Sequence, residues 1–252
     1  MRVFAGPNGS GKTSVIKSIR NYKTSNGKLD FGIYVNADDL VNEIKNKTFR
    51  FSEYQLKTTQ EDFNQIVLES GLINKDFPLK QFIACHDIKG DKIIFKNEKW
   101  IEQFAQALAD FLRKKLLKEK KKFSFETFFS HESKLEIMQK AKNEGYKVYL
   151  YFVSTSSPEI NKERVALRVK KGGHGVPPDK IESRYHRSLA LLFDASQIAY
   201  QAFFFDNSGE NKEPVMFANF KVIKGQKYWG HINVEKLPQW FVENYAQKIK
   251  HK

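Results

Sequence analysis

The sequence contains a single cysteine, Cys85, and no long hydrophobic run. One cysteine excludes an internal disulfide and is typical of a reducing cytoplasm, where we expect this chain to act. No apolar stretch reaches the roughly 18 residues that a membrane helix needs, so no transmembrane segment is predicted. The chain enters a motif at Gly6, and we expect no signal peptide before it. A content of 40% hydrophobic and 14% aromatic residues excludes intrinsic disorder, because so many large side chains form a core.

Arginine is also scarce, since only eight of the 43 basic residues are arginine. Acidic residues number 29. The formal net charge of +14 therefore comes mainly from lysines scattered along the chain. Such a surplus indicates either an anionic partner, such as nucleic acid, or a solvated coat of lysine on exposed helices. Scattered charge forms no patch, which favours the coat over a nucleic-acid partner. Four of the eight arginines nevertheless fall in one short window, residues 164–187.

Apolar periodicity predicts strands that alternate with helices. The expected strands are 2–5, 31–35, 123–127, 147–153 and 199–205, with a hairpin over 215–228. The expected helices are 12–22, helical stretches within 39–69, 100–122, 133–143, 158–171, 179–195 and 234–248. This order predicts an α/β fold, an αβα sandwich around a mainly parallel sheet, in one domain over residues 1–252. Residues of about 46–120 are expected to be an inserted α+β segment.

A phosphate-binding loop follows the first predicted strand. Eight residues match G-x-x-x-x-G-K-[ST] and, with Ser14, are the candidate ATP-binding residues: Gly6, Pro7, Asn8, Gly9, Ser10, Gly11, Lys12 and Thr13. The glycines let backbone N–H groups converge on phosphate oxygens at the start of a helix. We expect Lys12 to reach the β- and γ-phosphates and Thr13 to bind Mg²⁺.

The P-loop alone indicates only a nucleotide-binding protein. The chain has neither an L-S-G-G-Q signature of ABC ATPases nor an Asn-Lys-x-Asp base reader of GTPases. Kinases and motor-like ATPases remain, and a kinase needs a base for the acceptor hydroxyl. Asp38 follows the second predicted strand, where ligands bind in parallel sheets, and is the candidate base or metal ligand. The alternative is that Asp38 or Asp39 caps the next helix.

The arginine window indicates a mobile lid over about 164–184. Arg164 and Arg168 are four residues apart, so on a helix they share a face, and a glycine-rich run at 172–175 follows them. We expect these two arginines to contact the triphosphate. The alternative is that they pair with neighbouring glutamates on a surface helix. The other two arginines of the window, Arg184 and Arg187, remain open between a functional and a structural role.

Two further strand ends carry polar residues. Glu126 and Thr127 end the third strand and are candidates for contact with the acceptor substrate, and the carboxylate could instead contact the water shell of the metal. The alternative is that these residues only cap the end of the strand. Asp206 and Asn207 follow a later apolar strand. This segment is either a Walker B-like end, with Asp206 assisting the metal in place of Asp38, or a turn near the adenine that would make Asn207 a nucleotide contact.

This combination resembles the zeta-toxin-like P-loop kinases, specifically their chromosomal predicted-ATPase branch. The similarity covers about residues 1–40 and 120–210, and the segments that carry it are 5–13, 36–38, 125–127, 145–146, 164–169, 172–174 (with His174), 176–177, 184–185 and 206–208. The resemblance implies a shikimate-kinase-like core and phosphorylation of a hydroxyl group with ATP and Mg²⁺. In characterised relatives the acceptor is a UDP-linked N-acetylhexosamine and an antitoxin protein restrains the activity.

Carried over by position, the resemblance makes Asp38 the base, Arg164 and Arg168 the phosphate clamp and Glu126 an acceptor contact. The chain departs from the family pattern at Phe128, which follows Thr127 where relatives often have a different strand end. The segment 46–120 has no recognised counterpart. Two alternatives therefore stand beside a small-molecule kinase: a polynucleotide 5′-kinase, and an ATP-switched ATPase that binds nucleic acid or protein.

Overall fold

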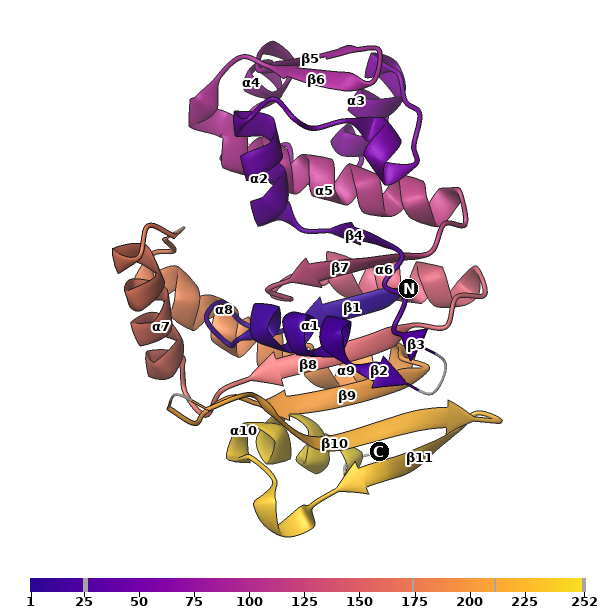
Figure 1. The fold of residues 1–252 in the computed structure, drawn as a ribbon, viewed down its shortest axis with the longest axis vertical. Helices are drawn as coiled ribbons and strands as arrows, with labels where there is room; N and C mark the ends of the chain where they lie inside the picture. Colours follow the sequence, from indigo (N-terminus) through magenta and orange to yellow (C-terminus); the bar gives the residue numbers. More distant parts are fainter. Residues whose placement is uncertain (25–26, 174, 211, 251–252) are drawn as a thin grey trace. The chain divides into compact units, whose positions relative to one another are not determined.

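The computed structural model describes residues 1–24, 27–173, 175–210 and 212–250 (Figure 1). The chain divides into two compact units. We call residues 1–30 and 126–252 the core unit, and residues 31–125 the middle unit. The predicted insertion at about 46–120 falls inside the middle unit. No helix among the described residues is both long and apolar enough to cross a membrane.

The core unit is built on five strands in the order β11-β10-β9-β8-β1. Their bounds are β1 (Arg2–Ala5), β8 (Tyr149–Ser154), β9 (Gln201–Asp206), β10 (Val215–Ile223) and β11 (Gln226–Ile232). Strands β1, β8 and β9 are parallel to one another, and β10 and β11 add an antiparallel hairpin beside β9. The centres of β1 and β8 are buried, as expected for apolar strands covered on both faces.

Helices cover both faces of this sheet (Figure 1). Helix α1 (Lys12–Asn21) packs on β1 and β8. Helix α9 (Leu192–Ile198), beside α6 (Ser133–Asn143), packs on the other side. The C-terminal segment lies on that side too, where the ring of Phe204 is 5.0 Å from Phe241 and 5.5 Å from Tyr245. Helices α7 (Pro158–Lys170) and α8 (Pro178–Ala190) pack on each other. The α/β fold class with a mainly parallel sheet is confirmed.

The middle unit packs its helices around aromatic side chains. It contains α2 (Ala37–Lys45), α3 (Gln60–Leu68), α4 (Leu79–Ala84), α5 (Ile101–Lys118) and the hairpin of β5 (His86–Lys89) and β6 (Lys92–Phe95). Strand β4 (Ile33–Val35) pairs in parallel with β7 (Phe123–Thr127), which runs from the middle into the core unit. The predicted apolar face of α5 is buried, and the ring of Phe111 lies 4.9 Å from Phe63.

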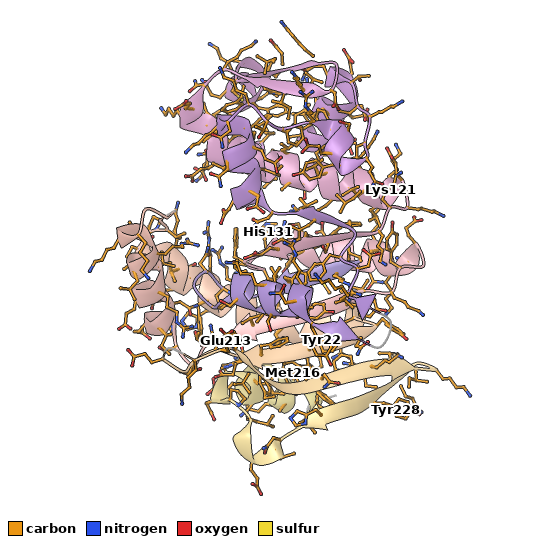
Figure 2. All side chains as sticks on the ribbon, in the orientation of Figure 1. Tyr22, Lys121, His131, Glu213, Met216 and Tyr228 are labelled. Carbon is orange, nitrogen blue, oxygen red and sulfur yellow. The ribbon has the colours of Figure 1, made fainter. Side chains whose placement is uncertain are left out.

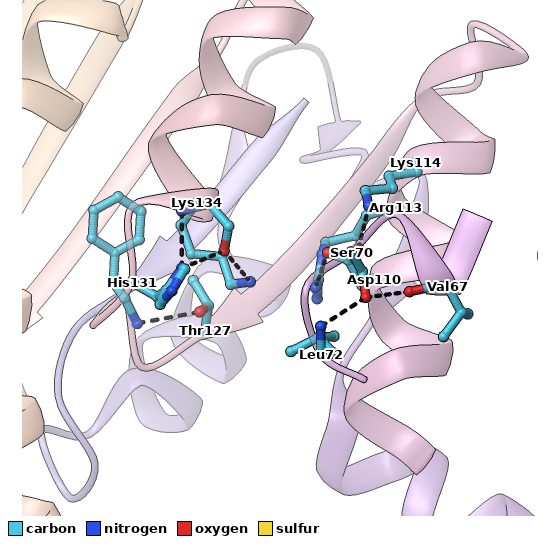
Figure 3. Close-up of polar contacts among 11 residues, drawn as sticks. Val67, Ser70, Leu72, Asp110, Arg113, Lys114, Thr127, His131 and Lys134 are labelled. Carbon is cyan, nitrogen blue, oxygen red and sulfur yellow. Dashed lines mark hydrogen bonds and ion pairs between the residues drawn. The ribbon is translucent and has the colours of Figure 1, made fainter. Parts of the chain in front are cut away.

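A charged pair lies buried in the same unit. Arg113 donates to Asp110 over 3.1 Å, and Lys114 contacts the same carboxylate at 2.9 Å (Figure 3). The guanidinium also lies 5.3 Å from the ring centroid of Phe125. Because a buried cation is costly unless it is paired, these contacts explain how Arg113 is accommodated.

Two expected helices differ from the structure, and one hairpin in the structure was not expected. The helix predicted over 179–195 is two helices, α8 and α9, separated at Leu191. The helix predicted over 234–248 is a 3₁₀ turn at 234–236 followed by α10 (Gln239–Phe241), a π-helical turn at 242–246 and α11 (Gln247–Lys250). Leu237 is extended because the proline after it disfavours helical backbone at this position. The helix therefore begins only after Pro238, at Gln239. A small hairpin, β2 (Lys23–Thr24) with β3 (Gly27–Lys28), was not predicted.

Candidate nucleotide-binding site

The predicted P-loop connects β1 to α1 in the core unit. Its three glycines, Gly6, Gly9 and Gly11, have φ values of 144°, 78° and 92°. A Cβ atom on Gly6 would lie 2.0 Å from the carbonyl oxygen of Val153, and one on Gly9 would lie 2.6 Å from that of Asn161. Only glycine fits both this backbone and this approach. The loop therefore forms a cradle with the backbone geometry that phosphate binding requires.

Asn207 holds this loop from the sheet side. Its side-chain nitrogen donates to the carbonyl oxygen of Ser10 over 2.9 Å, and its backbone N–H donates to Ser154 over 2.8 Å. The side chain is buried, and a Cβ on Gly11 would lie 2.1 Å from its nitrogen. Asn207, predicted as a nucleotide contact, thus contacts the backbone of the nucleotide loop itself.

Lys12 and Glu126 meet in the interior of the site. The Lys12 ammonium donates to the Pro7 carbonyl oxygen over 3.0 Å and lies 3.9 Å from Glu126 Oε1. Both side chains are largely buried, at 8% and 14% exposure, so the charges interact with little screening by water. Thr13 and Ser14 are exposed in the first turn of α1, which leaves the Thr13 side chain accessible to a bound metal ion.

The turn after β7 is held by local hydrogen bonds. The buried Thr127 hydroxyl accepts from the backbone N–H of Phe129 over 3.2 Å (Figure 3). His131 Nδ1 accepts from the backbone N–H of Ser133 over 3.2 Å, and the Ser133 hydroxyl is 3.3 Å from the Lys134 ammonium. Thr127 therefore shapes the turn beside Glu126, and its predicted contact with the acceptor stays a prediction.

Two arginines of the predicted lid reach this region from α7 and α8. Arg164 Nη2 donates to the Gly209 carbonyl oxygen over 3.0 Å, while its Nη1 is buried with no hydrogen-bond partner among the described residues. Arg184 Nη1 donates to Asn8 Oδ1 over 3.3 Å, and its guanidinium lies 4.2 Å from the ring centroid of Phe128. Arg184, left open by the sequence, contacts the P-loop directly.

Arg168 occupies a different position. It is exposed in the last turn of α7, and a Cβ on Gly173 would lie 2.6 Å from its Cγ. The side chain thus runs alongside the start of the glycine-rich segment. His174 lies outside the described residues, and the role of Arg168 in a lid stays a prediction.

Asp206 closes the turn that carries Asn207. Its carboxylate accepts from Trp240 Nε1 at 2.9 Å, from the Ser208 hydroxyl at 2.8 Å and from the Ser208 backbone N–H at 3.0 Å. The Ser208 hydroxyl also accepts from the backbone N–H of Ser156 at 2.8 Å. These contacts favour the turn over the Walker B-like alternative.

A buried polar floor beneath the loop was missed by sequence reasoning. The Thr155 hydroxyl donates to Asn161 Oδ1 over 2.7 Å, and the Tyr185 hydroxyl donates to the Thr155 carbonyl oxygen over 2.7 Å. Burial raises the pKa of Tyr185 to about 12, so the phenol remains protonated and continues to donate. The available signal was the polar pair Ser154-Thr155 at the end of an otherwise apolar strand.

Asp38 belongs to the middle unit. It is exposed in the first turn of α2, and the cap of that helix is Asn36, whose side chain accepts from the Asp38 backbone N–H over 3.0 Å. The alternative that Asp38 or Asp39 caps the helix is wrong, because the side chain of Asn36 already accepts the free N–H of Asp38. The role of Asp38 as base or metal ligand stays a proposal.

Comparisons with known proteins show one family match and three similar proteins or structures. Residues 50–211, more than half of the chain, match the Zeta toxin family. A protein of Haemophilus influenzae described only as uncharacterized is 36% identical over 63 residues, which cover 25% of this chain and 45% of that protein. A structure of AvrRxo1-ORF1 with ORF2 and ATP is 16% identical, with a TM-score of 0.52, and the match covers 90% of this chain and 59% of that one.

The structure of the PezAT chromosomal toxin–antitoxin system of Streptococcus pneumoniae is 14% identical over 98% of this chain and 78% of that one, with a TM-score of 0.47. At 16% identity, the likeness to the AvrRxo1-ORF1 structure indicates a shared fold only. This chain covers less than two thirds of the Haemophilus protein and of the AvrRxo1 chain. The family match begins after the P-loop, so the loop is supported by its own geometry while residues 50–211 identify the family. On that match, the chain belongs to the zeta toxin family.

Proposed function

We propose that the protein is an ATP-dependent kinase that transfers the γ-phosphoryl group of ATP to a hydroxyl of a small molecule. The observation that carries this proposal is the glycine cradle of residues 6–13, held by Asn207 and opening onto the buried Lys12–Glu126 pair. Membership of the zeta toxin family and the α/β fold support the same reaction class. The proposed acceptor class is a UDP-linked N-acetylhexosamine, as the family resemblance implies.

The P-loop would bind the triphosphate. Its backbone N–H groups and the positive end of α1 would hold the phosphate oxygens, and Lys12 would exchange the Pro7 carbonyl for a β- or γ-oxygen. Arg164 is held through Nη2 by Gly209, which leaves Nη1 to bind an oxygen of the transferred group. Arg184, fixed over Phe128, would add positive charge beside Asn8. Such groups stabilise the charge that spreads over the transferred phosphoryl oxygens.

The acceptor would be oriented and deprotonated by carboxylates. Glu126 would accept a hydrogen bond from an acceptor hydroxyl once the Lys12 ammonium turns toward phosphate. Asp38 is the proposed base, which would take the proton of the attacking hydroxyl. When bound, Mg²⁺ neutralises part of the negative charge of the phosphates. Thr13, with an exposed side chain beside the cradle, and Asp38 are the residues that would hold the ion.

The acceptor can be identified with γ-labelled ATP and a panel of UDP-sugars and oligonucleotides. The proposal expects label on a UDP-N-acetylhexosamine with the wild-type protein and none with Lys12→Met, which keeps the side-chain volume and removes the charge. Label on the 5′ end of an oligonucleotide would support a polynucleotide kinase in its place. Hydrolysis of ATP with no labelled acceptor would contradict the kinase proposal.

We further propose a protein partner of the antitoxin type. The AvrRxo1-ORF1 structures, which share the fold, are complexes with a second protein, ORF2. If a partner restrains the kinase, production of the wild-type chain alone in bacteria should arrest growth, whereas Lys12→Met should not. Equal growth with both proteins would count against a toxic activity that needs a partner.

A further inference from the structure

A row of polar and aromatic side chains crosses all five strands of the core unit. Arg2 lies opposite Tyr149, Tyr149 opposite Gln201, Gln201 opposite Lys221, and Lys221 opposite Tyr228. Residues in register on neighbouring strands project to the same face of a sheet. Lys221 and Tyr228 are exposed, Tyr228 at 52%, and the other three are half-buried. The five side chains therefore form one continuous surface strip.

Cations and rings alternate along this strip. The Arg2 guanidinium lies 4.5 Å from the ring centroid of Tyr149, whose ring is 5.7 Å from that of Tyr200. The ammonium groups of Lys147 and Lys221 lie 5.1 Å and 5.8 Å from the Tyr200 centroid. Arg2 is also held by hydrogen bonds from Nε to the Asp30 carbonyl oxygen over 3.1 Å and from Nη1 to the Tyr151 hydroxyl over 2.8 Å. Neutral groups therefore contribute to the positions of these cations, and a neutral partner leaves the positive charge of a cation in place.

On the face that carries the strip, described residues of β9, β10 and β11 remain at least partly exposed. On this face Phe203 and Asn219 are half-exposed, whereas their chain neighbours Phe204 and Phe220, on the opposite face, are fully buried. The aromatic residues of the C-terminal segment pack on Phe204 on that opposite side, whereas α1 packs on β1 and β8 on the face of the strip. Figure 2 shows Tyr228 on the outer strand. Sheet faces that remain open with rings and cations are the platforms on which single-strand-binding domains stack bases.

The charge of the core unit has the sign that such a platform requires. The core unit contains 26 of the 43 basic residues and 15 of the 29 acidic residues. The middle unit contains the other 17 basic and 14 acidic residues. Arg2 begins β1 while the P-loop follows the other end of the same strand, so the strip and the nucleotide cradle lie at opposite strand ends. Exposed Lys224, in the turn between β10 and β11, extends the positive charge.

We infer that this strip, Arg2, Tyr149, Gln201, Lys221 and Tyr228 with Lys147, Tyr200 and Lys224 beside it, binds single-stranded nucleic acid. Phosphates would contact the cations, and bases would stack against the exposed Tyr228 and half-exposed Phe203 rings. An acidic peptide would use the cations but leave the rings without a stacking partner. This inference does not rest on the kinase proposal.

Fluorescence anisotropy with labelled oligouridylate and oligothymidylate of about 16 nucleotides tests the inference and compares RNA with DNA. With about four phosphate contacts, the logarithm of the binding constant should fall with the logarithm of salt concentration at a slope of about −3. Lys147→Glu/Lys221→Glu/Lys224→Glu should bind at least about tenfold more weakly. The matched control, Lys75→Glu/Lys80→Glu/Lys89→Glu, changes three exposed lysines of the middle unit by the same charge and should bind as the wild type does.

Three single variants separate the contributions of ring stacking and of the nucleotide site from that of charge. Tyr228→Ala should weaken binding about tenfold while Tyr228→Phe keeps it, because only the ring stacks. Lys12→Met should bind the oligonucleotide normally, since the P-loop is not part of the strip. Equal losses in the two triple variants, no binding at low salt, or displacement by polyglutamate as effective as by unlabelled oligonucleotide would each overturn the inference.

Discussion

Replacing Gly11 with alanine would place a methyl group 2.1 Å from the side-chain nitrogen of Asn207. The variant combines two costs. Its φ of 92° lies in the left-handed region, where an L-residue costs about 1–2 kcal/mol. Overpacking against a buried neighbour costs about 1–3 kcal/mol more. The substitution should therefore destabilise the core unit and weaken ATP binding, because it moves the loop that holds the phosphates.

Asn207→Ala removes the source of the clash. The nearest remaining Asn207 atom to the new methyl group is its Cβ at 3.9 Å, an ordinary contact. By itself Asn207→Ala loses the hydrogen bond to Ser10 and leaves a buried carbonyl without it, at a cost of about 1–3 kcal/mol. The double variant should still bear the costs of the backbone strain and of the missing hydrogen bond, but not the cost of overpacking. Its loss in stability should be smaller than the sum of the single losses by about 1–3 kcal/mol.

Urea denaturation of the wild type, both single variants and the double variant measures this coupling. Gly145→Ala is the matched control, since Gly145 has a φ of 83° and no atom within 4 Å of an added Cβ. It should cost only the backbone strain and add to Asn207→Ala without coupling. Additive losses for Gly11→Ala and Asn207→Ala would refute the contact between the P-loop and Asn207.

Three other predictions concern the middle unit. Asp38→Asn should leave the affinity for ATP in the absence of Mg²⁺ unchanged and lower phosphoryl transfer by at least about 10²-fold in single-turnover kinetics, and unchanged transfer would exclude Asp38 as the base. His86 is buried, with Nδ1 donating to the Phe82 carbonyl and Nε2 accepting from Gln60, and burial lowers its pKa. Its contribution to stability is therefore fully present above its unfolded pKa of about 6.5 and is lost as the pH falls through the lower folded pKa. Between pH 6.5 and pH 5, the urea midpoint should fall less steeply with pH in His86→Phe than in the wild type. The same dependence on pH in both proteins would contradict this prediction. Burial raises the pKa of Cys85 to about 12, so a disulfide reagent at pH 8 should label it at least about 10²-fold more slowly in native than in denatured protein.

The P-loop and the long middle-unit helix could be predicted because their signals are local. Gly6, Gly9 and Gly11 stand at motif spacing between a strand and a helix, and all three adopt the left-handed backbone that only glycine takes readily. The apolar positions of α5 recur every three or four residues, and Phe104 and Leu108 are fully buried as that spacing indicates.

The contacts that complete the site could not be predicted because they join distant parts of the chain. Arg184 is 176 positions from Asn8, and Asn207 is 197 positions from Ser10. No periodicity relates such pairs, and only the fold brings them together. The broken C-terminal helix is different, because Pro238 was a readable local signal that apolar periodicity outweighed.

The central claim is that the loop over residues 6–13 holds a nucleoside triphosphate for transfer. Calorimetric titration of ATP into the wild type and Lys12→Met, with Mg²⁺ present, tests it most directly. The wild type should bind one ATP per chain, and Lys12→Met should bind at least about tenfold more weakly because a charge-assisted contact to phosphate is lost. Absence of ATP binding by the wild type, or equal affinity in both proteins, would contradict the claim.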